Sequence, residues 1–252
     1  MKFTELYSQV CRYGTQAETR AGSAKQSLNE EITVNVGEFP CRPGGSVSIG
    51  LIEGVQMIAG TAEMGPLKRF APHAKHELFG LNSFYGPRIA SQVPRLIREL
   101  RSNPNSRRAV LYVGNGGDSP ETLPCTSTIQ FQQKYPGSSY LTLTANMRSS
   151  DLVYGAPYDV IQFSMLAYAV ASCCEMIART VVIQTGNAHI YSSTEVFPAA
   201  WQQGTFRTPH QGTEWEDWVQ WARGIVYSGD TLTRSDFLSL FSVKLPVQES
   251  NN

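Results

Sequence analysis

The stretch "NMRSSDLVYGAPYD" (146–159) holds one arginine, two serines, two aspartates, a glycine and a proline. It leads directly into "VIQFSMLAYAVASCCEMIA" (160–178), an apolar segment that predicts a buried helix from about Asp159 to Arg179. Polar residues interrupt the apolar segment, so it does not have the composition of a membrane span. Polar groups packed this densely beside a core element indicate a binding site. The pattern does not itself explain why the stretch ends in an acid.

Strands and helices are predicted on both sides of this stretch. Alternating or apolar runs predict strands at 30–39, 107–114, 126–134, 138–150 and 180–193. Amphipathic spacing and stop residues predict helices at 45–60, 91–103 and 213–222. The order has no βαβ rhythm and no glycine-rich phosphate loop, which argues against a Rossmann fold. No repeat or linker divides the chain, so we expect a single domain over 1–252.

The composition is that of an ordinary globular protein. The 252 residues are 41% hydrophobic and 17% charged, with a net charge of zero and a pI of about 6.9. A general polyanion binder is more basic, so nucleic acid is not expected as the main partner. No signal segment is visible, and five cysteines without regular spacing argue against a disulfide framework, so we expect a cytoplasmic protein. The four histidines show no metal-ligand spacing, and no metal is expected.

Three groups of residues could carry chemistry. Cys125 follows a proline at a loop-to-strand junction, where it is either a small core residue or a nucleophile facing a cleft. Arg107 and Arg108 form either a solvated turn or an anion site; alternation would turn one of them toward the core unless both precede the strand. His189 and Tyr191 lie on the same side of an extended segment, where they either pack in the core or bind a sugar hydroxyl.

Seven blocks of the sequence resemble the thymidylate synthase superfamily. In chain order they are "GTQAETRAG", "LIEGVQMIAGT", "NSFYG", "NPNSRR", "LPCTSTIQF", "NMRSSDLVYGAPYD" and "GNAHIYS". The resemblance extends over roughly residues 10 to 195, and the chain after residue 197 is not recognisable. It implies an α/β (α+β) chain with the thymidylate synthase fold, a mixed twisted β-sheet flanked by helices, and a sheet-mediated dimer. The chain looks most similar to the deoxycytidylate and cytidylate hydroxymethylases, which resemble it in "CT" after the nucleophile and in "NMRS".

The resemblance implies roles for residues around the reacting carbon atoms. Cys125 would attack ring carbon 6 of a pyrimidine nucleotide and so make carbon 5 nucleophilic. Glu53 would handle protons through ordered water, and Tyr85 would assist near carbon 5. Asp151, with Gly155 in the same block, would face the pterin of the co-substrate 5,10-methylenetetrahydrofolate.

The resemblance also implies which residues hold the nucleotide. The groups that would bind the 5′-phosphate are Arg20, Arg148 and Ser149 from one subunit, with Arg107 and Arg108 from its partner. The enzyme would therefore be an obligate homodimer. His189 and Tyr191 would bind the sugar 3′-hydroxyl. Asn146 stands where the synthases usually have a glutamine, and it receives no role.

Asp159 is interpreted as the residue that selects the base. Thymidylate synthases end this motif in Asn, whose amide donates to uracil O4 and accepts from N3–H. An ionised Asp only accepts, so it suits the cytosine amino group, repels uracil O4 and favours a proton on N3. A mispaired buried polar group costs about 1–3 kcal/mol, or about ten- to a hundredfold in selectivity. The alternative is that Asp159 only caps the helix that follows, because Asp is a favoured N-cap residue.

The expected enzyme is a folate-dependent hydroxymethyltransferase acting on a pyrimidine nucleoside monophosphate. It would transfer a one-carbon unit from 5,10-methylenetetrahydrofolate to carbon 5 of dCMP, with hydration to 5-hydroxymethyl-dCMP. A synthase instead adds hydride to give a methyl group, and exclusion of water decides between these outcomes. The chain has no Trp before Trp201, whereas synthases carry one near the cofactor, and it shows no evident C-terminal lid. Both departures fit a wetter site.

Several alternatives stay open. A CMP 5-hydroxymethylase of nucleoside-antibiotic biosynthesis would share nearly every residue, because only the surroundings of the sugar 2′ position differ. A dUMP hydroxymethylase or a divergent thymidylate synthase would need Asn at position 159. A non-catalytic nucleotide- or RNA-binding relative would have no need of the Cys125 thiol. The setting is either phage DNA modification, in the host cytoplasm, or antibiotic biosynthesis, and the role of the segment 201–221 is not determined.

Overall fold

A computed structural model describes residues 1–42, 44–72, 84–196, 198–208 and 210–246. Its main sheet has seven strands in the order β1-β2-β8-β6-β5-β4, with β7 beside β8. The strands are β1 (Thr15–Thr19), β2 (Gly22–Asn35), β4 (Val110–Tyr112), β5 (Thr126–Gln133), β6 (Tyr140–Met147), β7 (Ser150–Asp151) and β8 (Ile177–Tyr191). β6 and β7 run parallel to β8 and the other neighbours are antiparallel, so the sheet is mixed. A separate two-stranded sheet pairs β3 (Glu38–Cys41) with β9 (Gln202–Thr205).

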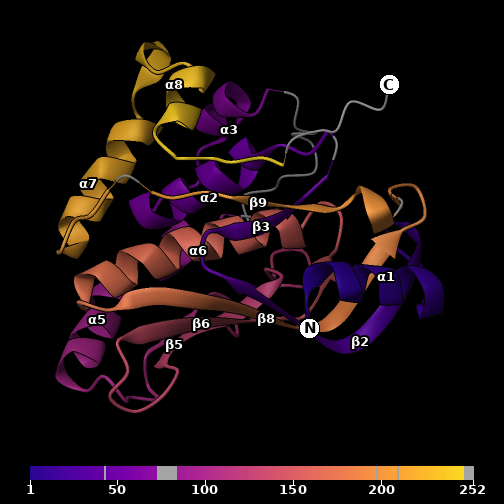
Figure 1. The fold of residues 1–252 in the computed structure, drawn as a ribbon, viewed down its shortest axis with the longest axis horizontal. Coiled ribbons are helices and arrows are strands. Elements are labelled where there is room, and N and C mark those ends of the chain that lie inside the picture. The colour runs from indigo at the N-terminus through magenta and orange to yellow at the C-terminus, as the bar shows by residue number, and fades with distance from the viewer. Residues whose placement is uncertain (43, 73–83, 197, 209, 247–252) are drawn as a thin grey trace.

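Helices cover one face of the main sheet in successive layers. Figure 1 shows α6 lying along the sheet, α2 stacked over α6, and α3, α7 and α8 further out. The helices are α1 (Phe3–Tyr13), α2 (Val47–Ala59), α3 (Met64–Phe70), α4 (Gly86–Ile89), α5 (Val93–Ser102), α6 (Ala156–Cys173), α7 (Trp215–Val226) and α8 (Arg234–Ser239). This arrangement confirms the expected mixed sheet flanked by helices. Of the helices in the described ranges, none has the length and apolarity needed to cross a membrane.

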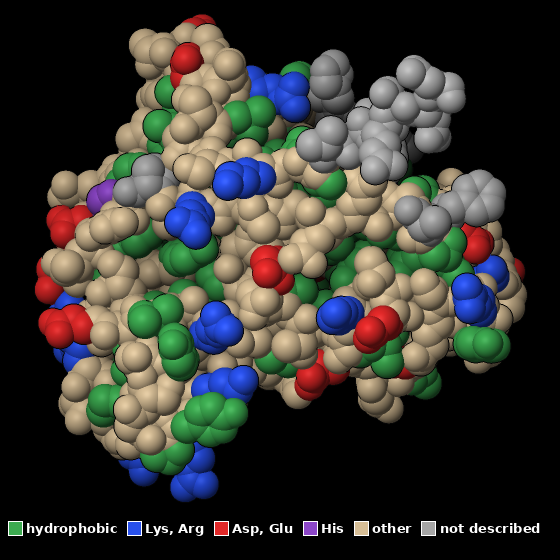
Figure 2. All heavy atoms as spheres, in the orientation of Figure 1, with side chains coloured by type: hydrophobic (Ala, Val, Ile, Leu, Met, Phe, Trp, Pro, Cys, Tyr) green, Lys and Arg blue, Asp and Glu red, His purple; other side chains and the backbone are tan. Residues whose placement is uncertain are grey.

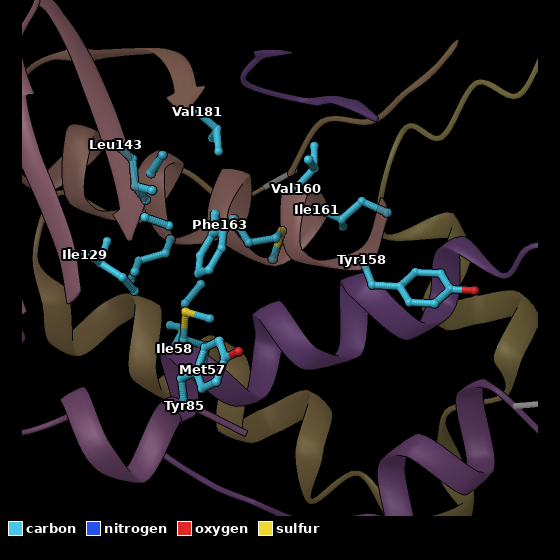
Figure 3. Packing of buried hydrophobic residues seen from close by; sticks show 14 of the residues in the cluster. Met57, Ile58, Tyr85, Ile129, Leu143, Tyr158, Val160, Ile161, Phe163 and Val181 are labelled. Carbon is cyan, nitrogen blue, oxygen red and sulfur yellow. The ribbon is translucent and has the colours of Figure 1, made fainter. Parts of the chain in front are cut away.

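The core explains why α6 is apolar on all sides. In Figure 3, Ile129, Leu143 and Val181 project from the strands toward α6, while Met57 and Ile58 of α2 lie on its other side. A helix enclosed in this way buries its whole circumference, so it carries no polar face. Phe163 of α6 is fully buried and points toward the α2 side.

Two glycines let α2 and α6 approach closely. A Cβ atom placed on Gly50 would lie 2.7 Å from Cβ of Ile161, and one on Gly54 would lie 2.8 Å from Cβ of Met165. Both distances are shorter than packed side chains allow. The two glycines are one helical turn apart, so they form a flat strip on the face of α2 that meets α6.

Several predicted element boundaries were wrong for local reasons. The strand expected at 30–39 is two strands, β2 and β3, because the chain turns at Gly37 with φ of 84°. The helix expected from Asp159 to Arg179 is α6, which begins at Ala156 and ends at Cys173, and Glu175 follows in a left-handed conformation with φ of 54°. That turn starts β8 at Ile177, earlier than expected.

The strand expected at 107–114 is shorter than the apolar run. β4 spans only Val110–Tyr112, so Arg107 and Arg108 both precede it, and both are exposed. The question of which arginine would face the core therefore does not arise. On the face drawn in Figure 2, basic and acidic side chains are interspersed, so an anion site on that face depends on local grouping.

The glycine strip generates a stability prediction. Gly54→Ala is expected to lower the free energy of unfolding by about 1–3 kcal/mol, because the new methyl group must displace Met165 and the backbone of Gln162. Urea denaturation followed by circular dichroism measures the change. Gly224→Ala is the matched control, since this exposed position within α7 has open space around it, and it should gain about 0.5–1 kcal/mol. Equal stability of Gly54→Ala and wild type would contradict the close packing of α2 on α6.

Candidate active site

The nucleophile candidate, Cys125, lies directly before β5 at the end of the sheet. Its carbonyl oxygen accepts from the Arg148 backbone N–H at 2.8 Å, which ties the loop to the end of β6. The Ser149 hydroxyl lies 3.9 Å from its Sγ. Burial raises the pKa of the thiol most, and the charge of Arg148 and the Ser149 hydroxyl act in the opposite direction. The free protein therefore holds a mostly protonated thiol beside groups that stabilise its thiolate.

Arg148 holds this loop with its guanidinium. Nε donates to the Pro124 carbonyl oxygen and Nη2 to that of Leu123, both at 3.2 Å. Nη1 donates to Ser149 Oγ at 3.1 Å. The side chain is nevertheless exposed, so its positive charge faces solvent beside the thiol. This is a local basic group of the kind that binds an anion.

Two acids from different helices are buried at this site, and the charge of Asp159 acts on both the Cys125 thiol and Glu53. Glu53 of α2 is 6% exposed and Asp159 of α6 is 7% exposed. Burial raises the pKa of Glu53 well above its usual value, and the charge of Asp159 raises it further. Burial also raises the pKa of Asp159 to about 6, against an opposing hydrogen bond from Gln162. Asp159 is therefore largely ionised at neutral pH, and its charge favours the protonated form of Glu53.

Asp159 does not cap α6. The cap position is Gly155, and Asp159 lies within the first turn, where its backbone N–H donates to the Gly155 carbonyl oxygen at 3.0 Å. A negative charge in the first turn is favoured by the helix dipole, but that effect does not require burial. The capping alternative for Asp159 is wrong.

Tyr85 joins the same cluster from the start of α4. It is buried, and its ring stacks on Phe163 with centroids 6.3 Å apart. Burial raises the pKa of its phenol well above the usual value, and the charges of Asp159 and Cys125 raise it further. Thr126, directly after the nucleophile, is fully buried, and its hydroxyl lies near the Tyr85 phenol, where it opposes the rise in the pKa of Tyr85. Among the described residues the Thr126 hydroxyl makes no hydrogen bond of normal geometry. The remainder of the "NSFYG" block, except Phe84 and Gly86, falls in 82–83, outside the described residues.

Asp151 is bound into the turn that precedes α6. Its Oδ1 accepts from the backbone N–H groups of Val153 at 2.7 Å and Tyr154 at 3.2 Å. A Cβ on Gly155 would lie 2.9 Å from the Asp151 carbonyl oxygen, so the turn needs glycine there. Burial raises the pKa of Asp151, and these two backbone hydrogen bonds oppose the rise. This turn determines where the first turn of α6, and therefore Asp159, begins.

His189 and Tyr191 lie at the end of β8, beside β7. Residues Asp151 and His189 are register partners, and the two rings of His189 and Tyr191 lie 5.0 Å apart. Burial lowers the pKa of His189, and the nearby charge of Asp151 opposes the change. His189 is therefore neutral at physiological pH and is able to donate or accept a hydrogen bond.

The remaining arginines are not all gathered at this site. Arg20 lies in the β1–β2 turn. Its charge acts on Glu121: the pKa of Glu121 is lowered mainly by hydrogen bonding to Ser119, and the charge of Arg20 lowers it further. Arg20 is therefore near the loop that leads to Cys125. Arg107 and Arg108 instead line a separate polar cavity of about 310 Å³ before β4.

A mainly apolar cavity of about 320 Å³ opens beside the segment 153–158, just before Asp159. Its lining includes Phe39, Arg42, Val153, Tyr158 and Trp201. The nucleophile and the buried acids are not part of this lining, but Tyr158 directly precedes Asp159. The sequence does not reveal this cavity, because β3, α2, α6 and the segment near residue 201 meet only in the fold. Within the described ranges, no group of three or more His, Cys, Asp or Glu side chains could hold a metal ion.

Comparison with known proteins places this arrangement in a family. The family described as thymidylate synthase matches residues 49–210. The chain belongs to the thymidylate synthase family, which confirms the resemblance at the level of the superfamily.

Individual relatives match over shorter spans. A thymidylate synthase of Coxiella burnetii is 32% identical over 108 residues, covering 42% of this chain and 40% of that protein. A thymidylate synthase of Agaricus bisporus is 29% identical over 135 residues, covering 51% of this chain and 46% of that protein. The chain thus spans less than half the length of these curated relatives.

The buried charge of Asp159 generates a pH prediction. Its pKa is about 6 in the folded protein against 3.8 for an unperturbed carboxyl, so ionisation opposes folding as the pH rises from about 4 to 6. Asp159→Asn should therefore be as stable as wild type near pH 4 and more stable above pH 6. The expected gain reaches about 3 kcal/mol. Urea denaturation from pH 4 to 8 measures the difference, and a difference that does not vary with pH would contradict the assignment.

Proposed function

We propose that this protein is a deoxycytidylate 5-hydroxymethyltransferase that uses 5,10-methylenetetrahydrofolate. The single observation that carries the proposal is the acid Asp159, buried next to Glu53 and close to the Cys125 thiol. A neutral amide at this position would serve uracil. A carboxylate that is ionised above about pH 6 serves cytosine.

Base recognition follows from the hydrogen-bonding capacity of a carboxylate. Asp159 would accept from the cytosine amino group and from a proton on N3. Uracil would place O4 against an acceptor, and its N3–H could satisfy only part of the carboxylate. The mismatch costs about 1–3 kcal/mol in a buried site, so discrimination of about ten- to a hundredfold is expected.

The covalent step would use the thiol and the groups around it. Cys125 would pass its proton to ring N3, directly or through water, and form the bond from Sγ to ring carbon 6, which makes carbon 5 nucleophilic. Arg148 and Ser149 favour the thiolate. Glu53, whose protonated form is favoured by burial, would donate or relay a proton through water near the exocyclic groups.

The apolar cavity supports the choice of a folate. Aromatic walls from Phe39, Tyr158 and Trp201 suit a flat p-aminobenzoyl group, and Arg42 supplies positive charge for the carboxylates of a glutamate tail. Arg42 also lies 5.0 Å from the centre of the Tyr154 ring, in the turn that holds Asp151. When bound, the folate supplies the one-carbon unit that becomes the hydroxymethyl group.

The first test is a matched turnover assay. Purified protein with 5,10-methylenetetrahydrofolate should add CH2O to dCMP and leave dUMP unchanged, with products identified by mass. CMP is included as the ribose counterpart of dCMP, so that the assay also identifies the preferred sugar. A methyl gain on dUMP would overturn the proposal in favour of a synthase. Cys125→Ala should abolish turnover, whereas Cys174→Ala, which alters a thiol at the end of α6, should retain it.

Replacement of Asp159, the acid proposed to recognise the base, gives a sharper result in the same assay. Asp159→Asn should lower kcat/KM for dCMP by about ten- to a hundredfold, since the amide cannot accept from both the amino group and N3. The same variant should gain binding of dUMP, measured by isothermal titration calorimetry. Unchanged preference for dCMP would mean that Asp159 does not read the base.

A homodimer is the second part of the proposal, supported by the sheet face turned away from α6. Most cross-strand neighbours on this face are polar, and a few apolar or aromatic side chains lie among them. The polar ones include Thr128, Gln130, Thr142, Thr144, Asn146 and Gln184, and the others include Val110, Tyr112 and Val182. Asn146 donates to Thr128 Oγ1 at 3.1 Å, which gives Asn146 a structural role on that face. Gln130 Nε2 donates to the Arg107 carbonyl oxygen at 3.0 Å, so the two exposed arginines lie at the edge of the same face. A partner packed on this face would bring its own Arg107 and Arg108 toward the Arg148 site.

Mixed dimers test this arrangement. Cys125→Ala protein and Arg107→Ala/Arg108→Ala protein should each be inactive alone or nearly so. After unfolding and refolding together, about half of the dimers are mixed, and each has one intact site if the arginines act across the interface. About a quarter of wild-type activity should then return. No recovery in a sample shown to contain mixed dimers would contradict action across the interface.

A further inference from the structure

Gln162 is a buried polar residue with one clear partner. It lies three residues after Asp159 on α6 and is 3% exposed. Its Nε2 donates to Asp159 Oδ1 at 2.7 Å. An ionised carboxylate only accepts hydrogen bonds, so the amide must turn its NH2 group toward the acid. Within the described ranges this is the one hydrogen bond to the Asp159 carboxyl group.

Among the described residues, the other ionisable groups that face Asp159 include no cation. They come from four separate elements: Glu53 on α2, Tyr85 at the start of α4, Cys125 before β5, and Asp151 on β7. The charge of Asp151 raises the pKa of Asp159 further. Each of these groups is neutral or negative. A carboxylate surrounded in this way is stabilised only by a donor held at a fixed position.

The packing of α2 holds Gln162 in place. A Cβ on Gly54 would lie 3.2 Å from Cα of Gln162, so the two helix backbones are in close contact at this point. The amide therefore reaches Asp159 from a backbone that has little room to move. Its burial also limits the access of bulk water to the donor position.

We propose that Gln162 is a positioning residue that holds the Asp159 carboxylate ionised and in one orientation, and thereby controls selectivity for cytosine. The proposal rests on the proposed function for the identity of the base. The hydrogen bond to Oδ1 fixes the plane of the carboxyl group. That leaves Oδ2, and the second lone pair of Oδ1, directed at a base in the site.

The test is the pH dependence of kcat/KM for dCMP in Gln162→Met. This variant keeps the length of the side chain and removes the donor. The acid limb of the profile should move to higher pH by about one unit, because a charge-assisted hydrogen bond to the ionised form is lost. At pH 5 kcat/KM should fall about tenfold, at pH 7 only about twofold, and nearly all of the loss should be recovered at pH 8.5. An unmoved acid limb would overturn the proposal.

Ser164→Ala is the matched control on the same helix. Ser164 is also fully buried, but its hydroxyl accepts from the Gly37 backbone N–H at 3.3 Å, away from Asp159. This variant should lose stability without moving the acid limb. If Gln162→Met does not fold, Gln162→Glu preserves the shape and places a second acid beside Asp159. It should move the limb in the same direction.

A measurement without substrate separates this proposal from the proposed function. The stability difference between the Asp159→Asn variant and its parent levels off at the folded-state pKa of Asp159, and the pH at which it levels off should rise by about one unit when both proteins also carry Gln162→Met. An unchanged levelling-off pH overturns the role of Gln162 whatever the substrate is. A raised levelling-off pH in a protein that turns over neither cytidylate supports the electrostatic role and overturns the proposed function alone.

Discussion

The site depends on the close contact between α2 and α6. Gly50 and Gly54 place no α2 side chain at this contact, so the backbone of α2 lies directly against the side chains of Ile161 and Met165 on α6. Glu53 is adjacent to Gly54, and this contact brings its carboxyl group within electrostatic reach of Asp159. A larger spacing would admit side chains or water between the acids. The same packing that completes the core therefore sets the distance between the two acids, and stability and chemistry cannot be varied independently there.

Burial divides the ionisable groups of the site by protonation state. The pKa values of Glu53, Tyr85 and Cys125 are raised, which favours their protonated forms, whereas Asp159 has a pKa of about 6 and is largely ionised at neutral pH. The free site thus holds the Asp159 carboxylate beside groups whose protonated forms are favoured. A substrate that offers a donor to that charge gains from an interaction with little solvent to compete. Groups with separated pKa values of this kind are typical of acid–base sites.

Sequence patterns predicted the parts that depend on local periodicity. The helix ending at Gly60 and the strands β5 and β6 follow from spacing and alternation, and the structure has them within a few residues. The break between β2 and β3 and the early end of α6 depend on left-handed residues at Gly37 and Glu175, which periodicity does not reveal. Gln162 escaped notice because it looked like one polar interruption of an apolar helix. Only its three-residue spacing from Asp159, considered with a helix that starts at Ala156, would have indicated the pair.

The cost of Asp159 argues that the acid is retained for function. An Asn at this position could still accept the Gln162 hydrogen bond and would avoid the burial of a charge. Helix capping does not explain the acid, because Gly155 is the cap and Pro157 already favours the first turn of α6. Burial and the charge of Asp151 make ionisation harder, and the Gln162 hydrogen bond only partly offsets them. A fold that tolerates an avoidable cost at the end of its most polar motif does so where the charge meets a ligand, and a ligand with adjacent donors fits that charge best.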